Sequence, residues 1–97
     1  MTDTTVRSST RVIGFDDPEL DFQLLRQLGT APYGGASVGE CLAAAAQIRD
    51  AGAHTWTDTF AELAERQRAD ADRFAAAGHR RSARERYLHS SNSYRAA

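Results

Sequence analysis

One stretch of this 97-residue sequence, residues 35–39, spells Gly-Ala-Ser-Val-Gly and so matches the G-x-S-x-G nucleophile elbow of serine hydrolases. That elbow requires a buried strand before the serine and a helix after it. Residues 30–35 contain Pro32 and two glycines, which cannot form the interior of a buried strand. Ser37 is better explained as the N-cap of a following helix, so we predict no catalytic residue in this chain.

The three histidines and the single cysteine are the residues that could bind a metal ion or act as a nucleophile. His54 and Asp58 are four residues apart, but no third ligand is near them in sequence, and His79 and His89 are isolated. Cys41 falls in the first turn of a predicted helix, where the helix dipole favours a thiolate, yet it also lies on the apolar face. We therefore predict a buried structural cysteine, no metal site and no cofactor.

Charge gives no sign of a nucleic-acid or membrane partner, because the formal net charge is −1. The last segment is locally basic, with Arg80, Arg81, Arg84, Arg86 and Arg95. The preceding segment carries a compensating acidic set, consisting of Asp58, Glu62, Glu65, Asp70 and Asp72. Ion pairs between two helices on a solvated face are the favoured interpretation, and a partner-docking face is the alternative.

The elements that carry these residues are predicted to be helices at about 18–28 and 38–51 in the first half of the chain. Asp17 is the expected N-cap of the first, with Pro18 at its first position. Ser37 and Glu40 have the spacing of a capping box at the start of the second. Residues 1–10 are polar, show no period and predict a disordered tail.

The second half predicts helices at about 56–77 and 83–97, with Ser82 and Glu85 as another capping box. The expected inward stripe of the third helix is Trp56, Phe60, Leu63, Gln67, Ala71 and Phe74. The expected inward face of the fourth helix is Ala83, Tyr87, Ser91 and Tyr94. The fourth helix has no stop signal, which predicts a chain that continues in a longer parent.

The predicted fold class is therefore all-α, a small bundle of about four helices in one domain. The expected core anchors are Phe22, Leu25, Leu28, Leu42, Ile48, Trp56, Phe60, Leu63, Phe74, Tyr87, Leu88 and Tyr94. The longest apolar run, residues 41–46, is too short to span a membrane, and residues 1–10 hold no secretory signal. These features predict a cytoplasmic protein.

Two stretches carry a family resemblance. Residues 33–42, Tyr-Gly-Gly-Ala-Ser-Val-Gly-Glu-Cys-Leu, are followed after a loop by Trp56, and residues 78–88 continue through the Ser-Asn-Ser-Tyr of 91–94. Together they resemble the N-terminal helical region of α/β-hydrolases of the dihydroxypseudooxynicotine hydrolase type, the fungal polyketide-shortening hydrolases and the fermentation-respiration switch protein group. The resemblance covers about residues 20–97. Ser93 and His89 depart from the family pattern.

In that family the helical region precedes an α/β-hydrolase domain and covers its active site as a cap. The resemblance implies that residues 11–97 are such a cap segment, whose partner is its own hydrolase domain. The Ser-Asp-His triad that cleaves ester, acyl or C–C bonds belongs to that later domain, so no catalytic residue is carried over. Tyr33, Asn92 and Tyr94 are the polar groups near the two motifs that we expect to face substrate.

Two other functions stay open at this stage. One is a standalone protein-interaction module, because the last two helices faintly resemble a tetratricopeptide-like pair, although a single repeat is unstable alone. The other is a remnant of a degraded hydrolase gene. A cap without its body should leave the face of Tyr87, Leu88 and Tyr94 only partly covered, which also allows self-association through that face.

Overall fold

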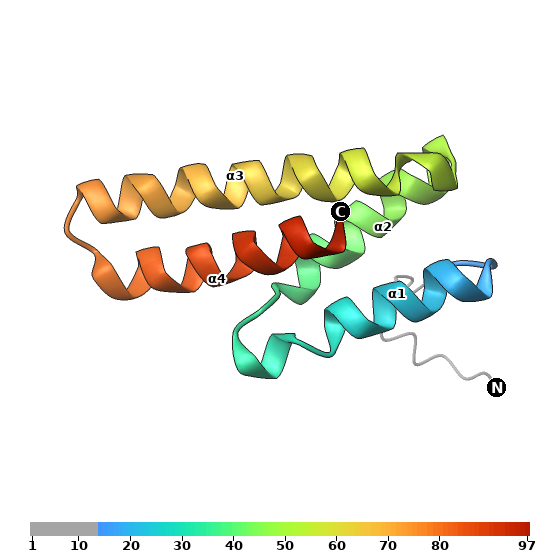
Figure 1. The fold of residues 1–97 in the computed structure, drawn as a ribbon, viewed down its shortest axis with the longest axis horizontal. Helices are drawn as coiled ribbons and strands as arrows, with labels where there is room; N and C mark the ends of the chain where they lie inside the picture. The colour runs from blue at the N-terminus through green and yellow to red at the C-terminus, as the bar shows by residue number, and fades with distance from the viewer. Residues whose placement is uncertain (1–13) are drawn as a thin grey trace, which may run out of the picture.

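The computed structural model describes residues 14–97, and every element among them is helical (Figure 1). The α-helices are α1 (Pro18–Leu28), α2 (Val38–Ala51), α3 (Trp56–Ala76) and α4 (Arg80–Ala96), with 3₁₀ turns η1 (Ala31–Tyr33) and η2 (Ala53–Thr55). The all-α prediction is confirmed for this part of the chain. The predicted tail at 1–10 lies outside the described residues.

α3 and α4 form an antiparallel hairpin that runs side by side along the molecule (Figure 1). Gly78 makes the turn with a φ of 82°, a left-handed conformation that glycine adopts without a Cβ clash. The amide of His79 donates to the Phe74 carbonyl oxygen at 2.8 Å and that of Gly78 to Ala75 at 3.0 Å, which is the Schellman pattern.

α4 begins three residues earlier than predicted, because the chain turns from Gly78 directly into helix. The N-cap is His79, whose carbonyl oxygen accepts from the Ala83 amide at 2.9 Å. Ser82 therefore lies inside the first turn, and the predicted Ser82–Glu85 capping box is wrong.

The predicted inward face of α4 is confirmed at Ala83 and wrong at Tyr87, Ser91 and Tyr94, which are exposed. The buried residues of α4 are Ala83, Ser90 and Ser93, while Tyr87, Leu88 and Tyr94 are each more than 40% exposed. Small side chains let α4 approach α3 closely, and both serines satisfy their hydroxyls there. The hydroxyl of Ser90 donates to the Ala64 carbonyl oxygen at 2.8 Å, and that of Ser93 to Gln67 Oε1 at 2.7 Å.

The core lies where α1, α2 and α3 meet, and it is built from few large side chains among many alanines. Ile48, Phe60 and Leu63 are fully buried and act as the anchors that the sequence predicts. The Trp56 ring packs on Phe60 with centroids 4.6 Å apart. Of the other anchors predicted outside α4, Phe22 and Leu25 are exposed, so that part of the prediction is wrong. The remaining ones are half-buried, namely Leu28, Leu42, Trp56 and Phe74.

The N-caps follow the sequence in part. Asp17 caps α1, since its Oδ1 accepts from the Glu19 amide at 2.8 Å. Ser37 holds the N-cap position of α2, but its side chain makes no capping hydrogen bond. The predicted capping box fails there because Glu40 turns toward α3 and α4 instead.

Candidate functional site

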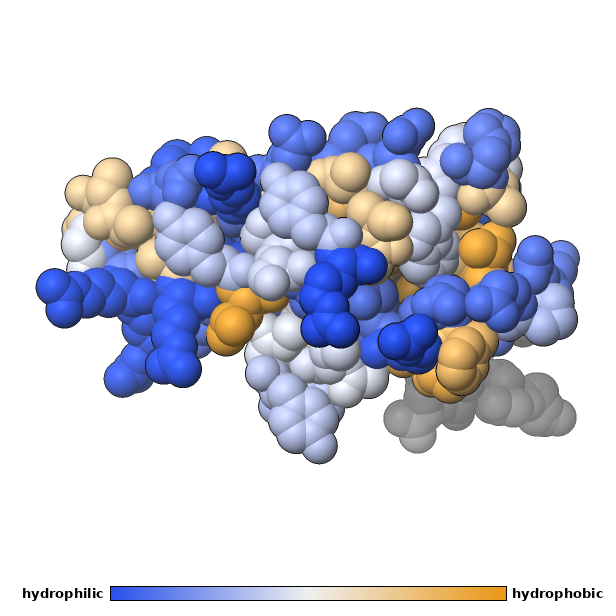
Figure 2. Space-filling view, in the orientation of Figure 1, coloured by the Kyte–Doolittle hydropathy of each residue, from blue (hydrophilic) through white to orange (hydrophobic). Residues whose placement is uncertain are grey.

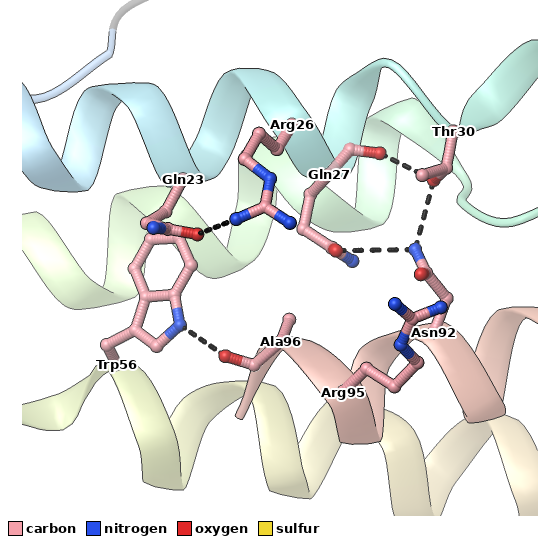
Figure 3. Close-up of a pocket in the computed structure, with 8 residues that line it drawn as sticks. All are labelled: Gln23, Arg26, Gln27, Thr30, Trp56, Asn92, Arg95 and Ala96. Atoms are coloured by element: carbon pink, nitrogen blue, oxygen red, sulfur yellow. Dashed lines mark hydrogen bonds between the residues drawn. The ribbon is translucent and has the colours of Figure 1, made fainter.

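A hollow of the described surface lies between α1 with η1 on one side and the end of α4 on the other. Its inner part has a volume of about 200 Å³ (Figure 3) and its outer part about 540 Å³. Both parts share Arg26, Thr30, Asn92 and Arg95 in their walls. We call the two parts together the α1–α4 groove.

Hydrogen bonds across the groove fix its shape. Trp56 Nε1 donates to the Ala96 carbonyl oxygen at 2.8 Å and so ties the start of α3 to the end of α4 (Figure 3). Asn92 Nδ2 donates to Thr30 Oγ1 at 3.0 Å and to Gln27 Oε1 at 3.3 Å. Asn92 is 62 positions from Thr30 and 65 positions from Gln27 in the sequence. The groove therefore exists only in the folded chain.

The side chains that line the groove can donate hydrogen bonds and carry positive charge. Its walls hold the guanidinium groups of Arg26 and Arg95 but no carboxylate, histidine or cysteine among the residues that line it. The hydroxyls of Thr30, Tyr33 and Ser91 therefore have no base beside them in the groove. The residues that line the groove therefore form no general acid–base or nucleophilic site.

Two of the three predicted substrate-facing residues line this groove. Tyr33, which is 87% exposed, and Asn92 both line the outer part of the groove. Tyr94 is exposed on α4 and lines neither part. Sequence reasoning missed Arg26, Gln27 and Arg95. Arg95 stands beside the second motif, but nothing in the sequence links α1 to α4.

Outside the groove, a polar cluster joins α2, α3 and α4 through Arg86. Its Nη1 and Nη2 donate to Glu40 Oε1 and Oε2 at 2.8 and 3.0 Å, and Nη2 also donates to Asp70 Oδ2 at 2.8 Å. Gln67 extends the cluster by donating from Nε2 to Glu40 Oε1 at 3.0 Å. The predicted ion pairing between the last two helices is confirmed at Arg86 and Asp70.

This cluster shifts the titration of its members. The hydrogen bonds from Arg86 hold the pKa of Glu40 below its usual value, against the opposing effect of burial. Burial, together with the nearby Arg86 charge, lowers the pKa of His89. The lowered pKa values favour the charged form of Glu40 and the neutral form of His89 at neutral pH.

The Cys41 thiol and the metal-binding types of side chain form no reactive or metal site among residues 14–97. Burial, reinforced by the Glu40 charge, raises the pKa of Cys41 to about 11, so its thiol is protonated and inert at neutral pH. The buried structural role predicted for Cys41 is thereby confirmed. Within residues 14–97 no group of three His, Cys, Asp or Glu side chains is placed to hold a metal ion.

Several large hydrophobic side chains reach the surface. The exposed ones among residues 14–97 belong to α1, η1, the start of α2 and α4, and are Phe22, Leu25, Tyr33, Val38, Tyr87, Leu88 and Tyr94. α3 contributes none of them. Figure 2 shows hydrophobic groups separated by strongly hydrophilic side chains on the face it presents. The partial exposure predicted for Tyr87, Leu88 and Tyr94 is confirmed.

None of the described helices is long and apolar enough to cross a membrane. No protein-family model matches the chain, and no solved structure matches it either.

Among curated proteins, the chain is similar to a segment of several fungal hydrolases. It is 46% identical over 83 residues to the alpha/beta hydrolase psoB of Aspergillus fumigatus, which covers 86% of this chain and 19% of that protein. It is 40% identical over 77 residues to the 20-hydroxy-prefusarin hydrolase of Gibberella moniliformis, covering 79% of this chain and 18% of that protein. The chain thus spans about a fifth of the length of the curated relatives it matches.

Proposed function

We propose that this chain is the helical cap segment of a serine α/β-hydrolase of the dihydroxypseudooxynicotine hydrolase and fermentation-respiration switch protein type. In this role it packs over the active site of a hydrolase domain that supplies the whole triad. The segment closes the pocket and shapes access for an ester, acyl or C–C substrate. By itself it hydrolyses nothing and needs no cofactor.

The observation that carries the proposal is the similarity to fungal α/β hydrolases over 77–83 residues. Identity of 40–46% over nearly the whole chain requires a shared helical structure, yet the match takes in less than a fifth of each of those two relatives. The described residues also hold a recognition groove and no nucleophile–base pair. A segment that contacts substrate without reacting with it accounts for both observations.

The two sides of the bundle support a particular docking direction. The outer face of α3 is charged, with exposed Glu62, Glu65 and Arg66 and no exposed large hydrophobic residue. The opposite side, formed by α1, η1 and α4, exposes Leu25, Leu88 and their apolar neighbours. Because burying a large apolar side chain stabilises by about 1.5–3 kcal/mol, the hydrolase domain is expected to cover this second side.

On this docking direction the α1–α4 groove faces the hydrolase domain, and Tyr33 and Asn92 reach the substrate from its rim. Tyr94 lies outside the groove and is assigned here to the domain contact or to the far end of a long substrate. A cytoplasmic location belongs to the same proposal, since a reduced, buried Cys41 requires no oxidising compartment.

The test uses the Aspergillus relative as the source of a hydrolase domain. A form of that enzyme lacking the 83 matched residues is mixed with this chain, and binding is followed by isothermal titration calorimetry. Labelling of the active serine by a fluorophosphonate and hydrolysis of p-nitrophenyl esters are measured in parallel. We expect no hydrolysis from the chain alone, one-to-one binding, and recovery of labelling or turnover on mixing.

A matched pair of surface variants makes the test specific. L25S combined with L88S changes exposed residues on the proposed docking side and should weaken binding at least tenfold. E62S combined with R66S, on the outer face of α3, should leave it unchanged. If the truncated relative neither binds the chain nor gains activity, the cap role is wrong. The chain would then be a standalone interaction module if it bound a different protein, and a gene remnant if it bound none.

A further inference from the structure

We propose that the α1–α4 groove is a binding site for a carboxylate that carries a hydrocarbon tail. The inner part would hold the carboxylate through Arg26, Arg95 and the side-chain amide of Gln27, and the outer part would hold the tail. The inference concerns described residues of this chain and stands independently of the hydrolase role proposed above.

The first observation is an unsatisfied donor at the base of the groove. Gln27 is 8% exposed and lines the inner part, and its Nε2 is the one buried side-chain polar atom in residues 14–97 that lacks a hydrogen-bond partner. A buried polar group without a partner destabilises the fold, because it loses its hydrogen bond to water and gains none in return. Such a group is expected to be satisfied by something that binds.

The hydrogen bonds around Gln27 determine which of its side-chain atoms lacks a partner. The Thr30 hydroxyl donates its only proton to the Gln27 carbonyl oxygen at 2.7 Å, so it must accept from Asn92 Nδ2. Asn92 Nδ2 then also donates to Gln27 Oε1. Exchanging the oxygen and nitrogen of Gln27 would set donor against donor. The open position is therefore a donor, and it calls for an acceptor oxygen.

The second observation is the charge around that donor. Arg26 and Arg95 enter from opposite walls, one from α1 and one from α4, and both line the inner and outer parts (Figure 3). The Arg26 side chain makes one long hydrogen bond, 3.4 Å to Gln23 Oε1, and the Arg95 side chain makes none among residues 14–97. Both side chains are exposed, so they can shift to admit an oxygen to Gln27 Nε2.

The size and the apolar wall of the outer part of the groove indicate what the ligand carries beside its carboxylate. At about 540 Å³ it is larger than the inner part, and its walls include Tyr33, Leu88 and the backbone of Gly29 and Gly35. A small hydrophilic anion would leave this apolar wall uncovered. A carboxylic acid with a medium-length hydrocarbon tail would satisfy the inner donors and also cover the outer wall.

The test is a titration of the ¹⁵N-labelled full chain with octanoate, followed by two-dimensional NMR. We expect saturable shifts of the Gln27 side-chain amide pair, the Asn92 amide pair and the Leu88 backbone amide. 1-Octanol has the same tail without the charge and should bind at least tenfold more weakly, since hydrogen bonds to a charged group contribute about 1.5–3 kcal/mol. The octanoate affinity should also fall as the salt concentration rises.

Three variants complete the design. Q27E keeps the acceptor for Asn92 and turns the open donor into a carboxylate, so it should abolish octanoate binding. R95M should weaken binding about tenfold, while R84M, an exposed arginine on the same helix, should change nothing. Circular dichroism confirms that each variant is folded. Equal affinity for octanol and octanoate, or unchanged binding by Q27E, would overturn the proposal, as would the absence of saturable shifts at Gln27.

Discussion

Replacing Arg86 with methionine tests whether the polar cluster between α2, α3 and α4 stabilises the fold. Arg86 donates three hydrogen bonds to Glu40 and Asp70 at 2.8–3.0 Å, and R86M removes all of them while keeping the aliphatic stem. Breaking a fully buried pair costs about 3–5 kcal/mol, whereas an exposed pair contributes about 0.2–1 kcal/mol.

The exposure of the three groups places this cluster between those limits. The Arg86 side chain is 17% exposed, and those of Glu40 and Asp70 are 33% and 32% exposed. Water can therefore reach part of each carboxylate once the guanidinium is gone. We expect R86M to lower the free energy of unfolding by about 2–3 kcal/mol, and the melting temperature by about 10–20 °C for a domain of this size.

The assay is urea unfolding at pH 7 and pH 4, followed by circular dichroism at 222 nm, with R84M as the control on the same helix. Arg86 holds the pKa of Glu40 below its ordinary value of 4.5. A lowered folded-state pKa gives stability that is complete above the unfolded pKa and is lost as pH falls through the folded pKa. In R86M the stabilising partner is gone, so the difference between wild type and variant should shrink at pH 4.

Lowering of the His89 pKa acts in the same direction and starts nearer pH 6.5, because protonating this residue disfavours the folded state. Wild-type stability should therefore decline from about pH 6.5 downward and more steeply below about pH 4.5. If R86M costs no more than R84M at pH 7, or the same at both pH values, our account of the cluster is refuted.

Three further outcomes follow from single positions. F60A should destabilise by about 3–5 kcal/mol in urea unfolding monitored by Trp56 fluorescence, because the Phe60 ring is fully buried; a loss below 1 kcal/mol would contradict the assigned core. G78A should cost about 1–2 kcal/mol, since alanine is strained at a φ of 82°, whereas G39A, inside α2 with open space around it, should not destabilise. Cys41 should react with dithionitrobenzoate at pH 8 only in denaturant, and rapid labelling of the native chain would disprove its burial.

The sequence was sufficient to predict which segments are helical, because the signals involved are local. Asp17, Pro18 and Ser37 indicate where α1 and α2 begin, and the apolar stripe from Trp56 to Phe74 indicates α3. The start of α4 shows the limit of such local signals. The spacing of Ser82 and Glu85 suits a helix start, but the Schellman hydrogen bonds from Gly78 and His79 set the start of α4 at Arg80.

The groove could be predicted only in fragments, because its parts come from distant segments. Tyr33 and Asn92 stood out beside recognisable motifs, and both line it. Gln27 did not stand out, since its significance depends on Asn92, which lies 65 residues later and occupies its Oε1. Glu40 was misread for a similar reason. Its spacing from Ser37 suited a capping box, but its partner is Arg86, 46 residues away.

α4 buries its small residues and exposes its large ones because of the surface that α3 presents to it. Ala64, Gln67 and Ala71 present a shallow surface with one polar side chain, which suits close contact with Ala83, Ser90 and Ser93 and leaves no room for a tyrosine. The large residues of α4 must then face outward, where Leu88 and Tyr94 each leave more than 40% of their surface in water. In an isolated bundle this arrangement forgoes a large part of the apolar burial that α4 can provide. A second layer over α1, η1 and α4 would recover that burial, and a hydrolase domain in that position would also enclose the one groove in which Arg26 and Arg95 converge.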